Sequence, residues 1–227
     1  MKVHRPADQR GRTTHGARTR LCTFSSGDYH DAAWMGFGAL RQLNEEHLPA
    51  GTRVASQRVA NMELLSFVLD GMLVRDDVVL ETGALAWTGA GHASDTPVET
   101  AGDAGARVLR IALQPDRVNL PPAGGVSRLA ADASGAWSLL ASPDAPDALP
   151  VRLQAWLRHA RLAPGGRVEL ALGASQRHWL HVLRGALTID GSVLGAGDAL
   201  GWQAEAVATA IVAMDAGAEL LLFTLPG

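Results

Sequence analysis

The sequence of 227 residues has little cysteine, little lysine and no long apolar run. Cys22 is the one cysteine, so the chain cannot form an internal disulfide, and a reducing compartment such as the cytoplasm is expected. No apolar run approaches the roughly 18 residues of a membrane helix. The polar opening MKVHRPADQRGRTTHGARTR shows no secretory signal. These absences predict a cytoplasmic protein without a membrane partner.

Basic residues are spread singly along the chain. Lys2 is the one lysine, all the other basic residues are arginines, and the net charge is −3 without a block of one sign. A nucleic-acid-binding stripe or an anchor for anionic membranes would gather basic residues in one place. The pattern therefore predicts no nucleic-acid partner, and ordinary surface positions for the arginines.

Helical periodicity is scarce, and short apolar runs alternate with glycine, aspartate and proline instead. Examples are MELLSFVLDG, ARVLRIALQPD, GRVELALG and AELLLFTLPG. Runs of this kind are typical of many short antiparallel strands in a sandwich or barrel. LTIDGSVL predicts a hairpin, because Asp190-Gly191 suits the positive φ angles of a tight primed turn.

One segment of the sequence has a similar second copy later in the chain. FVLDGMLVRDDVVLETG from Phe67 matches HVLRGALTIDGSVLGAG from His181 when it is shifted by 114 residues. The shared positions are Val68/Val182, Leu69/Leu183, Gly71/Gly185, Leu73/Leu187, Asp76/Asp190, Val79/Val193, Leu80/Leu194 and Gly83/Gly197. Glycines repeated at matched turns indicate one β unit used twice, hence two tandem barrels. The Pro/Gly-rich middle of the chain indicates a connector, so we expect one domain over 1–125 and a second over 126–227.

The repeated order of strands, glycines and hairpin resembles the cupin pattern, and two copies resemble a bicupin. The opening RGRTTHGARTRLCTFSSGDYHDAAWMGFGALRQLNEEHLPAG, then NMELLSFVLDG, LLASPD and LLLFTLPG, resemble the pirin family. The similarity is greatest to its bacterial quercetin 2,3-dioxygenase-like branch and covers nearly the whole chain. It implies an all-β fold of two tandem cupin barrels, each a double-stranded β-helix or jelly roll.

The resemblance also implies a mononuclear metal site in the first barrel. Members of the family hold Fe(II) or another divalent ion through a His-x-His pair and a later His-x-Glu pair, and a set of imidazoles and a carboxylate suits such an ion. Some members oxidise flavonols such as quercetin, and the animal relative is a transcriptional cofactor. The second barrel of the family is structural and holds no metal.

This chain departs from the family at the metal ligands. The His-x-His positions fall on Gln57 and Val59, and the His-x-Glu positions fall on Ser94 and Thr96. Valine cannot coordinate a metal, and neutral amide and hydroxyl groups bind divalent ions weakly. We therefore expect no metal and no other cofactor.

Other residues could rebuild a metal site. His92 lies two positions before the lost histidine, on the same face of a regular strand, and Glu63 lies at the glutamate position of the general cupin motif. Gln57 and Asp95 could complete a set with these two. The alternative is that Glu63 is a hydrogen-bonding residue of the barrel wall and His92 a loop residue at its mouth.

A buried Glu63 without a metal would need a partner. Arg53 or Arg58 is the expected one, and a protonated carboxyl is the alternative. In the second barrel, His178 and His181 lie three residues apart on one strand and are expected to point to opposite faces. They predict no shared metal.

The sequence thus favours a metal-free protein whose first barrel binds a small organic ligand or a protein partner, with no catalytic residue assigned. The expected cavity-lining residues are Arg53, Gln57, Glu63, Trp87, His92 and Ser94. One alternative is a quercetin 2,3-dioxygenase-like enzyme with a rearranged site, using His92 and Glu63 as metal ligands. Another is a regulatory partner of a second protein.

Overall fold

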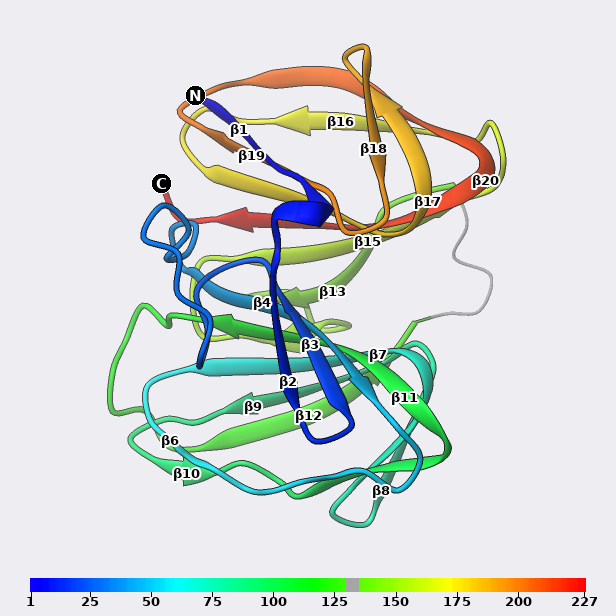
Figure 1. The fold of residues 1–227 in the computed structure, drawn as a ribbon. Coiled ribbons are helices and arrows are strands. Elements are labelled where there is room, and N and C mark those ends of the chain that lie inside the picture. Colours follow the sequence, from blue (N-terminus) through cyan, green and yellow to red (C-terminus); the bar gives the residue numbers. More distant parts are fainter. Residues whose placement is uncertain (130–134) are drawn as a thin grey trace. The chain divides into compact units, whose positions relative to one another are not determined.

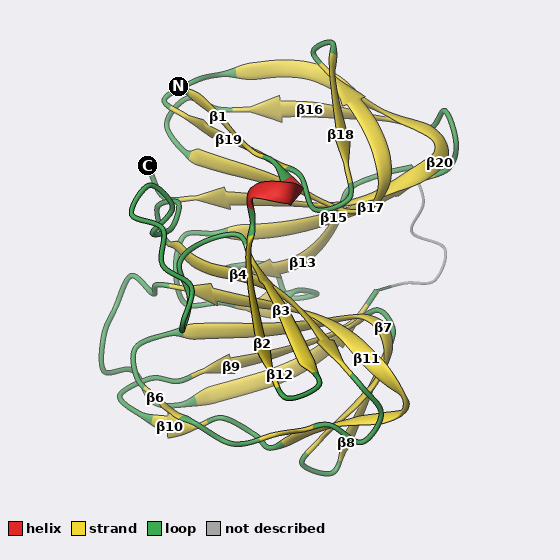
Figure 2. Ribbon diagram, in the orientation of Figure 1, coloured by secondary structure: helices red, strands yellow, loops and turns green. Residues whose placement is uncertain are grey.

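The computed structural model describes residues 1–129 and 135–227. Antiparallel strands make up almost all of its regular structure, and the one helix in these residues is a short 3-10 turn, η1 (Ala7–Gln9) (Figures 1 and 2). No helix of the described chain has the length and apolar character needed to cross a membrane. The all-β class predicted from the sequence is confirmed.

The chain forms two compact units, described here one at a time. The N-terminal unit comprises residues 10–129 and 149–153, and the C-terminal unit comprises residues 1–9, 135–148 and 154–227. The units thus exchange two short segments relative to the division expected at residue 125. The division into one cupin domain over 1–125 and a second over 126–227 stays a prediction.

The N-terminal unit is built on one antiparallel sheet. Its order is β12-β9-β7-β11-β4-β3-β2, with β5 paired to β11, β8 paired to β7, and a separate pair of β6 with β10 (Figure 1). The strands are β2 (Gly11–His15), β3 (Arg18–Cys22), β4 (Leu40–Leu48), β5 (Arg53–Val54), β6 (Arg58–Val59), β7 (Glu63–Arg75), β8 (Val78–Glu81), β9 (Ala84–Gly89), β10 (Ser94–Asp95), β11 (Glu99–Leu113), β12 (Ala123–Arg128) and β14 (Leu149–Pro150).

The C-terminal unit repeats this plan. Its sheet runs in the order β1-β19-β17-β20-β15-β13, with β16 paired to β20 and β18 paired to β17. The strands are β1 (Lys2–Arg5), β13 (Ser138–Ser142), β15 (Trp156–Leu162), β16 (Arg167–Leu172), β17 (Arg177–Ile189), β18 (Ser192–Gly195), β19 (Ala199–Gln203) and β20 (Val207–Leu225).

The sequence repeat has a direct structural counterpart. Strands β7 and β17 begin and end 114 residues apart, and so do β8 and β18. Gly71 and Gly185 both have positive φ angles, of 73° and 68°, and a side chain on either would overlap a backbone carbonyl of the facing strand. The predicted hairpin at Asp190-Gly191 is also present, with φ angles of 48° and 73°. Glycine is therefore required where the two copies share it.

The interior of the N-terminal barrel is apolar at one end and polar at the other. Because alternate residues of a strand share a face, Val68 and Ser66 both face inward, as do Val108 and Arg110. The apolar end consists of Leu48, Val68, Leu73, Leu80, Ala84, Ala86, Ala101, Ala106 and Val108. Apolar side chains thus fill one end of the barrel, and polar side chains such as Ser66 and Arg110 face inward at the other end.

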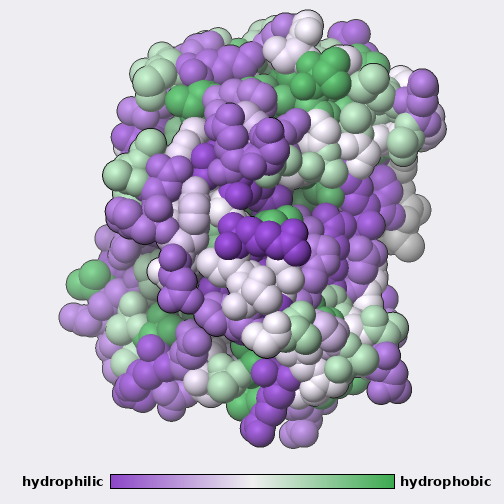
Figure 3. Space-filling model, in the orientation of Figure 1, coloured by the Kyte–Doolittle hydropathy of each residue, from purple (hydrophilic) through white to green (hydrophobic). Residues whose placement is uncertain are grey.

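The molecular face drawn in Figure 3 carries mainly hydrophilic residues. On the face drawn in Figure 3, apolar side chains lie among hydrophilic ones rather than in one broad patch. The exposed large apolar residues are Met1, Met35, Val78, Val79, Val118, Val126, Val193 and Met214. Single apolar residues of this kind are ordinary on a protein surface.

Candidate functional site

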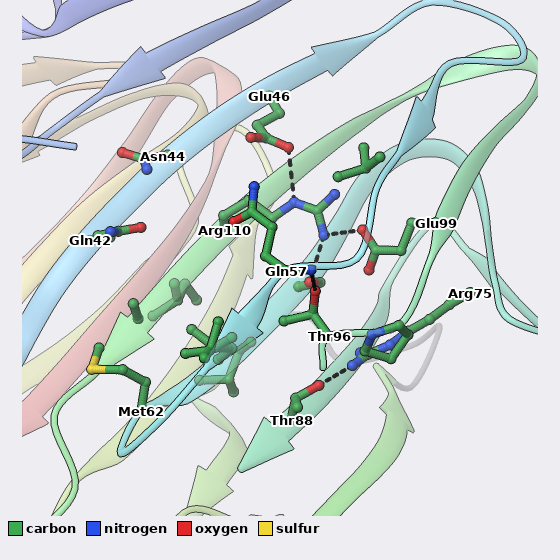
Figure 4. A pocket seen from close by; sticks show the side chains of 18 of the residues that line it. Gln42, Asn44, Glu46, Gln57, Met62, Arg75, Thr88, Thr96, Glu99 and Arg110 are labelled. Atoms are coloured by element: carbon green, nitrogen blue, oxygen red, sulfur yellow. Dashed lines mark hydrogen bonds and ion pairs between the residues drawn. The ribbon is translucent and has the colours of Figure 1, made fainter. Parts of the chain in front are cut away.

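The polar end of the N-terminal barrel contains a cavity of about 260 Å³. Strand β4 contributes Gln42, Asn44 and Glu46, and β11, β7 and β9, which follow β4 in the same sheet, contribute further lining residues (Figure 4). Its charged lining residues are Arg18, Arg20, Glu46, Arg75, Glu99 and Arg110. Four guanidinium groups and two carboxylates leave the lining with a net charge of +2.

Glu46 is the centre of one ion-pair network in this cavity. It is almost fully buried, and its two oxygens accept hydrogen bonds from Arg18 Nη2 at 2.5 Å, Arg20 Nε at 2.8 Å and Arg110 Nε at 3.0 Å. Burial alone would raise the pKa of this carboxyl. The charges of Arg110, Arg18 and Arg20 outweigh that effect and lower the pKa to about 2. Glu46 is therefore ionised at neutral pH.

Arg110 joins Glu46 to a second carboxylate. Its Nη1 lies 2.5 Å from Glu99 and donates to Ser66 Oγ at 2.7 Å (Figure 4). Burial disfavours the charged guanidinium, but Glu99 and Glu46 together raise its pKa. The Nη2 group of Arg110 is buried and has no hydrogen-bond partner within the described residues. This nitrogen is thus left without a partner in the described chain after Arg110 has bonded to Glu46, Glu99 and Ser66.

Arg75 lies beside this pair. The pairing of β11 with β7 places it opposite Glu99, and its guanidinium donates to Thr88 Oγ1. Burial lowers the pKa of Arg75, and the charge of Arg110 lowers it further, while the charges of Glu99 and Asp76 act in the opposite direction. Arg75 forms no ion pair with a carboxylate in the described chain, so its charge is only partly compensated.

The four positions that the sequence predicts to correspond to the family's metal ligands lie together. Strands β6 and β10 pair so that Val59 is opposite Ser94. Gln57 and Thr96 come next, since the Gln57 N–H donates to Thr96 Oγ1 at 3.0 Å and the Thr96 N–H donates to the Gln57 carbonyl at 2.9 Å. Three of the four, all except Ser94, line the cavity.

These residues do not fit a divalent metal ion. One is apolar, one offers a neutral amide, and two offer neutral hydroxyls, of which that of Thr96 already accepts a hydrogen bond. The nearby guanidinium groups of Arg75 and Arg110 would repel a cation. Among the residues that the structure describes, no group of three histidine, cysteine, aspartate or glutamate side chains is placed to hold a metal.

The six residues expected to line one cavity are separated in the structure. Gln57 lines the cavity described above, whereas Trp87 and Ser94 line a shallower depression beside β12. Arg53 is exposed on β5, and His92 is exposed in the loop before β10 with its backbone N–H bonded to the Leu120 carbonyl. Ligand contact by these residues stays a prediction.

Glu63 belongs to a different cluster. It is fully buried, and its Oε1 accepts hydrogen bonds from Arg152 Nη2 at 2.6 Å and Nε at 2.9 Å. Its Oε2 accepts from Trp87 Nε1 at 2.8 Å and from the Arg152 N–H at 3.3 Å. The expectation that Arg53 or Arg58 pairs with Glu63 is therefore wrong, since Arg152 is its partner and Arg58 pairs with Asp95.

Sequence reasoning missed the arginines of the site. The expectation of ordinary surface positions is wrong for Arg110, whose side chain is 18% exposed, and for Arg10, which is paired with the buried Glu45. A signal for Arg110 was present in ARVLRIAL, where it shares the face of Ala106 and Val108 by strand alternation. A charged residue at an inward position indicates either a partner or a site.

Comparisons with known proteins agree with this architecture. A family model described as the quercetinase C-terminal cupin domain matches residues 139–225. The chain is 30% identical to the quercetin 2,3-dioxygenase of Escherichia coli strain K12, over 98% of this chain and 97% of that protein. It is 29% identical to a pirin-like protein of Caulobacter vibrioides, over 98% of both.

A solved structure shows the same likeness. The bacterial pirin YhhW from Escherichia coli in complex with nickel(II) has a TM-score of 0.91 and 29% identity to this chain. The match covers 100% of this chain and 99% of that one. The bicupin fold predicted from the sequence is thus confirmed, and the 30% identity to a relative along nearly the whole length establishes the family. The chain belongs to the pirin family of bicupins.

Proposed function

We propose that this chain is a metal-free member of the pirin family whose N-terminal barrel binds a small organic anion. The observation that carries the proposal is the charge of the cavity, where Arg18, Arg20, Arg75 and Arg110 outnumber Glu46 and Glu99. In a partly desolvated site an uncompensated guanidinium gains from a bound carboxylate more than it would in water.

The volume of the cavity and its hydrogen-bond donors restrict the size and charge of the ligand. A volume of about 260 Å³ lies just below the range of roughly 300–1,000 Å³ that is usual for drug-sized ligands. Arg110 Nη2 has no hydrogen-bond partner among the described residues, and Arg75 forms no ion pair there. These two groups, on neighbouring strands, are the donors that we expect the ligand to meet. A net charge of +2 matches a small dicarboxylate, and we take succinate as the probe.

The absence of a metal is the first part of the proposal to test. We expect the native chain, purified without chelator and incubated with nickel(II) or Fe(II), to retain no metal in elemental analysis after desalting. The variant Gln57→His, Val59→His, Ser94→His, Thr96→Glu is expected to retain one nickel ion per chain, because the pairing of β6 with β10 holds these positions together.

One outcome would count against the absence of a metal in the native chain, and another against the match of these four positions with the family's metal site. Near-stoichiometric metal in the native chain, lost in His92→Ala, would support the rearranged dioxygenase site instead. A quadruple variant that folds but binds no nickel would show that the backbone arrangement of the family's site is not kept.

Anion binding is the second part. We expect calorimetric titration to show saturable binding of succinate and none of the neutral succinamide. Arg75→Gln should weaken succinate binding about 10- to 100-fold, as expected for the loss of a hydrogen bond to a charged group. Arg128→Gln is the matched control, since it removes an exposed arginine of the same unit that does not line the cavity. Equal affinity of both variants would refute the assignment.

A further inference from the structure

A second cavity, of about 550 Å³, lies at the mouth of the C-terminal barrel. Arg158, His178 and Thr224 line it from strands β15, β17 and β20, and Leu172 and Leu222 form part of its apolar floor. Strand alternation places Arg158 on the face of Ala160 and Leu162, which belong to the barrel core. The polar residues of the mouth thus face the barrel interior.

This cavity occupies the same place in its barrel as the N-terminal cavity does in its own. Leu48 pairs with Ala106, and Leu162 pairs with Ala218, at the matched glycine contacts of the two copies. Four residues before each leucine stand Asn44 and Arg158. Seven residues before the matched glycines Gly71 and Gly185 stand Leu64 and His178, which pair with Ala112 and Thr224 respectively. The internal repeat has therefore placed a polar end in both barrels, with different side chains.

A chain of hydrogen bonds fixes the polar groups of the mouth. His178 Nε2 lies 3.0 Å from the Gly173 carbonyl and must carry a proton to donate to it. Burial and the nearby charge of Arg158 lower the pKa of His178, so the neutral ring leaves Nδ1 as an acceptor for the Thr224 hydroxyl at 3.3 Å. The hydroxyl oxygen accepts in turn from Arg158 Nη1 at 3.2 Å.

Arg158 has no carboxylate partner among the described residues, and its bond to Thr224 uses only one of five N–H donors. Burial lowers its pKa, and no neighbouring carboxylate opposes that effect. The one carboxylate in the lining, Glu169, is exposed and pairs with Arg167 at 2.9 Å. On the opposite face of the same strand Arg161 does pair with an acid, Glu219. The guanidinium of Arg158 thus lacks a counter-charge.

Two tryptophans line the same cavity as this arginine. Trp137 packs on the barrel core and donates its indole N–H to the Glu169 carbonyl at 2.9 Å, which fixes the ring. Trp156 lies two residues before Arg158, on the same face of β15. Partly buried aromatic rings next to one fixed charge suit a ligand with a flat apolar body and a charged end.

We propose that the mouth of the C-terminal barrel is a second binding site, specific for a small aromatic monocarboxylate. Arg158 binds the carboxylate through its free donors, and Thr224 and His178 hold the guanidinium in place. Trp137, Trp156 and Leu222 contact the aromatic body. The site is independent of the anion site proposed for the N-terminal barrel.

Benzoate and its neutral isostere benzamide test this proposal by calorimetric titration. We expect benzoate to bind saturably in the millimolar range or tighter, and benzamide not to bind. Arg158→Gln should weaken benzoate binding about 10- to 100-fold. Arg161→Gln, the same substitution three residues along on the outer face of β15, should leave the affinity unchanged.

The location of binding can be read separately from the indole N–H signals of the six tryptophans in a ¹H–¹⁵N spectrum. Benzoate should shift the signals of Trp137 and Trp156 and leave that of Trp87, in the other barrel, unmoved. It should do so equally in the Arg75→Gln variant. If Arg158→Gln does not fold, Arg158→Lys is the substitute. It keeps the positive charge but cannot donate two parallel hydrogen bonds to one carboxylate, so weaker benzoate binding is expected there too.

Three results would overturn the inference. They are no benzoate binding by the native chain at tens of millimolar, equal affinity in Arg158→Gln, and a shift confined to Trp87. The last two would assign benzoate to another site. Failure of succinate binding in the N-terminal barrel would leave the present inference standing.

Discussion

Replacing Arg152 by glutamine is expected to lower the free energy of unfolding by about 3–5 kcal/mol, the usual cost of removing one partner of a buried ion pair. The substitution removes two of the four hydrogen bonds that Glu63 accepts, those from Nε and Nη2. Glu63 has no exposed surface through which water could replace them. Urea unfolding followed by circular dichroism measures the loss.

A surface ion pair of the same unit provides the matched control. Arg128 and Glu81 lie 2.8 Å apart but are more than half exposed, so Arg128→Gln should cost less than about 1 kcal/mol. The double variant Arg152→Gln, Glu63→Gln should recover part of the loss, because it removes the uncompensated carboxylate as well. Equal costs of Arg152→Gln and Arg128→Gln would show that the pair is not a stabilising contact.

The barrels could be predicted from the sequence because their turns need particular residues. Gly71 and Gly185 adopt positive φ next to a facing carbonyl, and Asp190-Gly191 forms a tight hairpin. These demands are local, so they remain visible as a repeat of glycines between apolar runs. The short segments that the two units exchange, 1–9 and 149–153, have no such local marker.

The partners within the site could not be predicted, because they come from distant parts of the chain. Glu63 is bound by a residue 89 positions later, whereas Arg53 and Arg58, which are near in sequence, do not reach it. Arg110 meets Glu46 across 64 residues. Strand alternation predicts which way a side chain faces, but the identity of its neighbour depends on the order and register of the strands.

The two carboxylates of the N-terminal cavity explain why arginines gather there. A buried carboxylate needs a cationic or hydrogen-bonding partner, and here guanidinium groups provide it for both Glu46 and Glu99. The arginines exceed this structural need, since Arg75 forms no ion pair with a carboxylate within the described chain. This excess, rather than the presence of arginine as such, supports an anion site.

Glu46→Gln tests the structural part of that network through its pH dependence. The folded-state pKa of about 2 lies below the ordinary value of 4.5, so the ionised carboxylate stabilises the fold fully above pH 4.5. That stabilisation is lost as the pH falls through the folded pKa. From the difference between the two pKa values, the variant should be less stable than the native chain by about 3 kcal/mol at pH 7.

The gap between native and variant unfolding free energies should stay constant from pH 7 to 5 and close as the pH approaches 2. Glu219 also has a pKa of about 2, lowered by His159 and Arg161 against the effect of burial, but it is present in both proteins and cancels in the difference. Glu81→Gln removes an exposed carboxylate and should show almost no gap at any pH. A gap for Glu46→Gln that persists unchanged at pH 2 would contradict this prediction. It would mean that the substitution destabilises the fold by disturbing packing, and not by removing the charge that pairs with Arg18, Arg20 and Arg110.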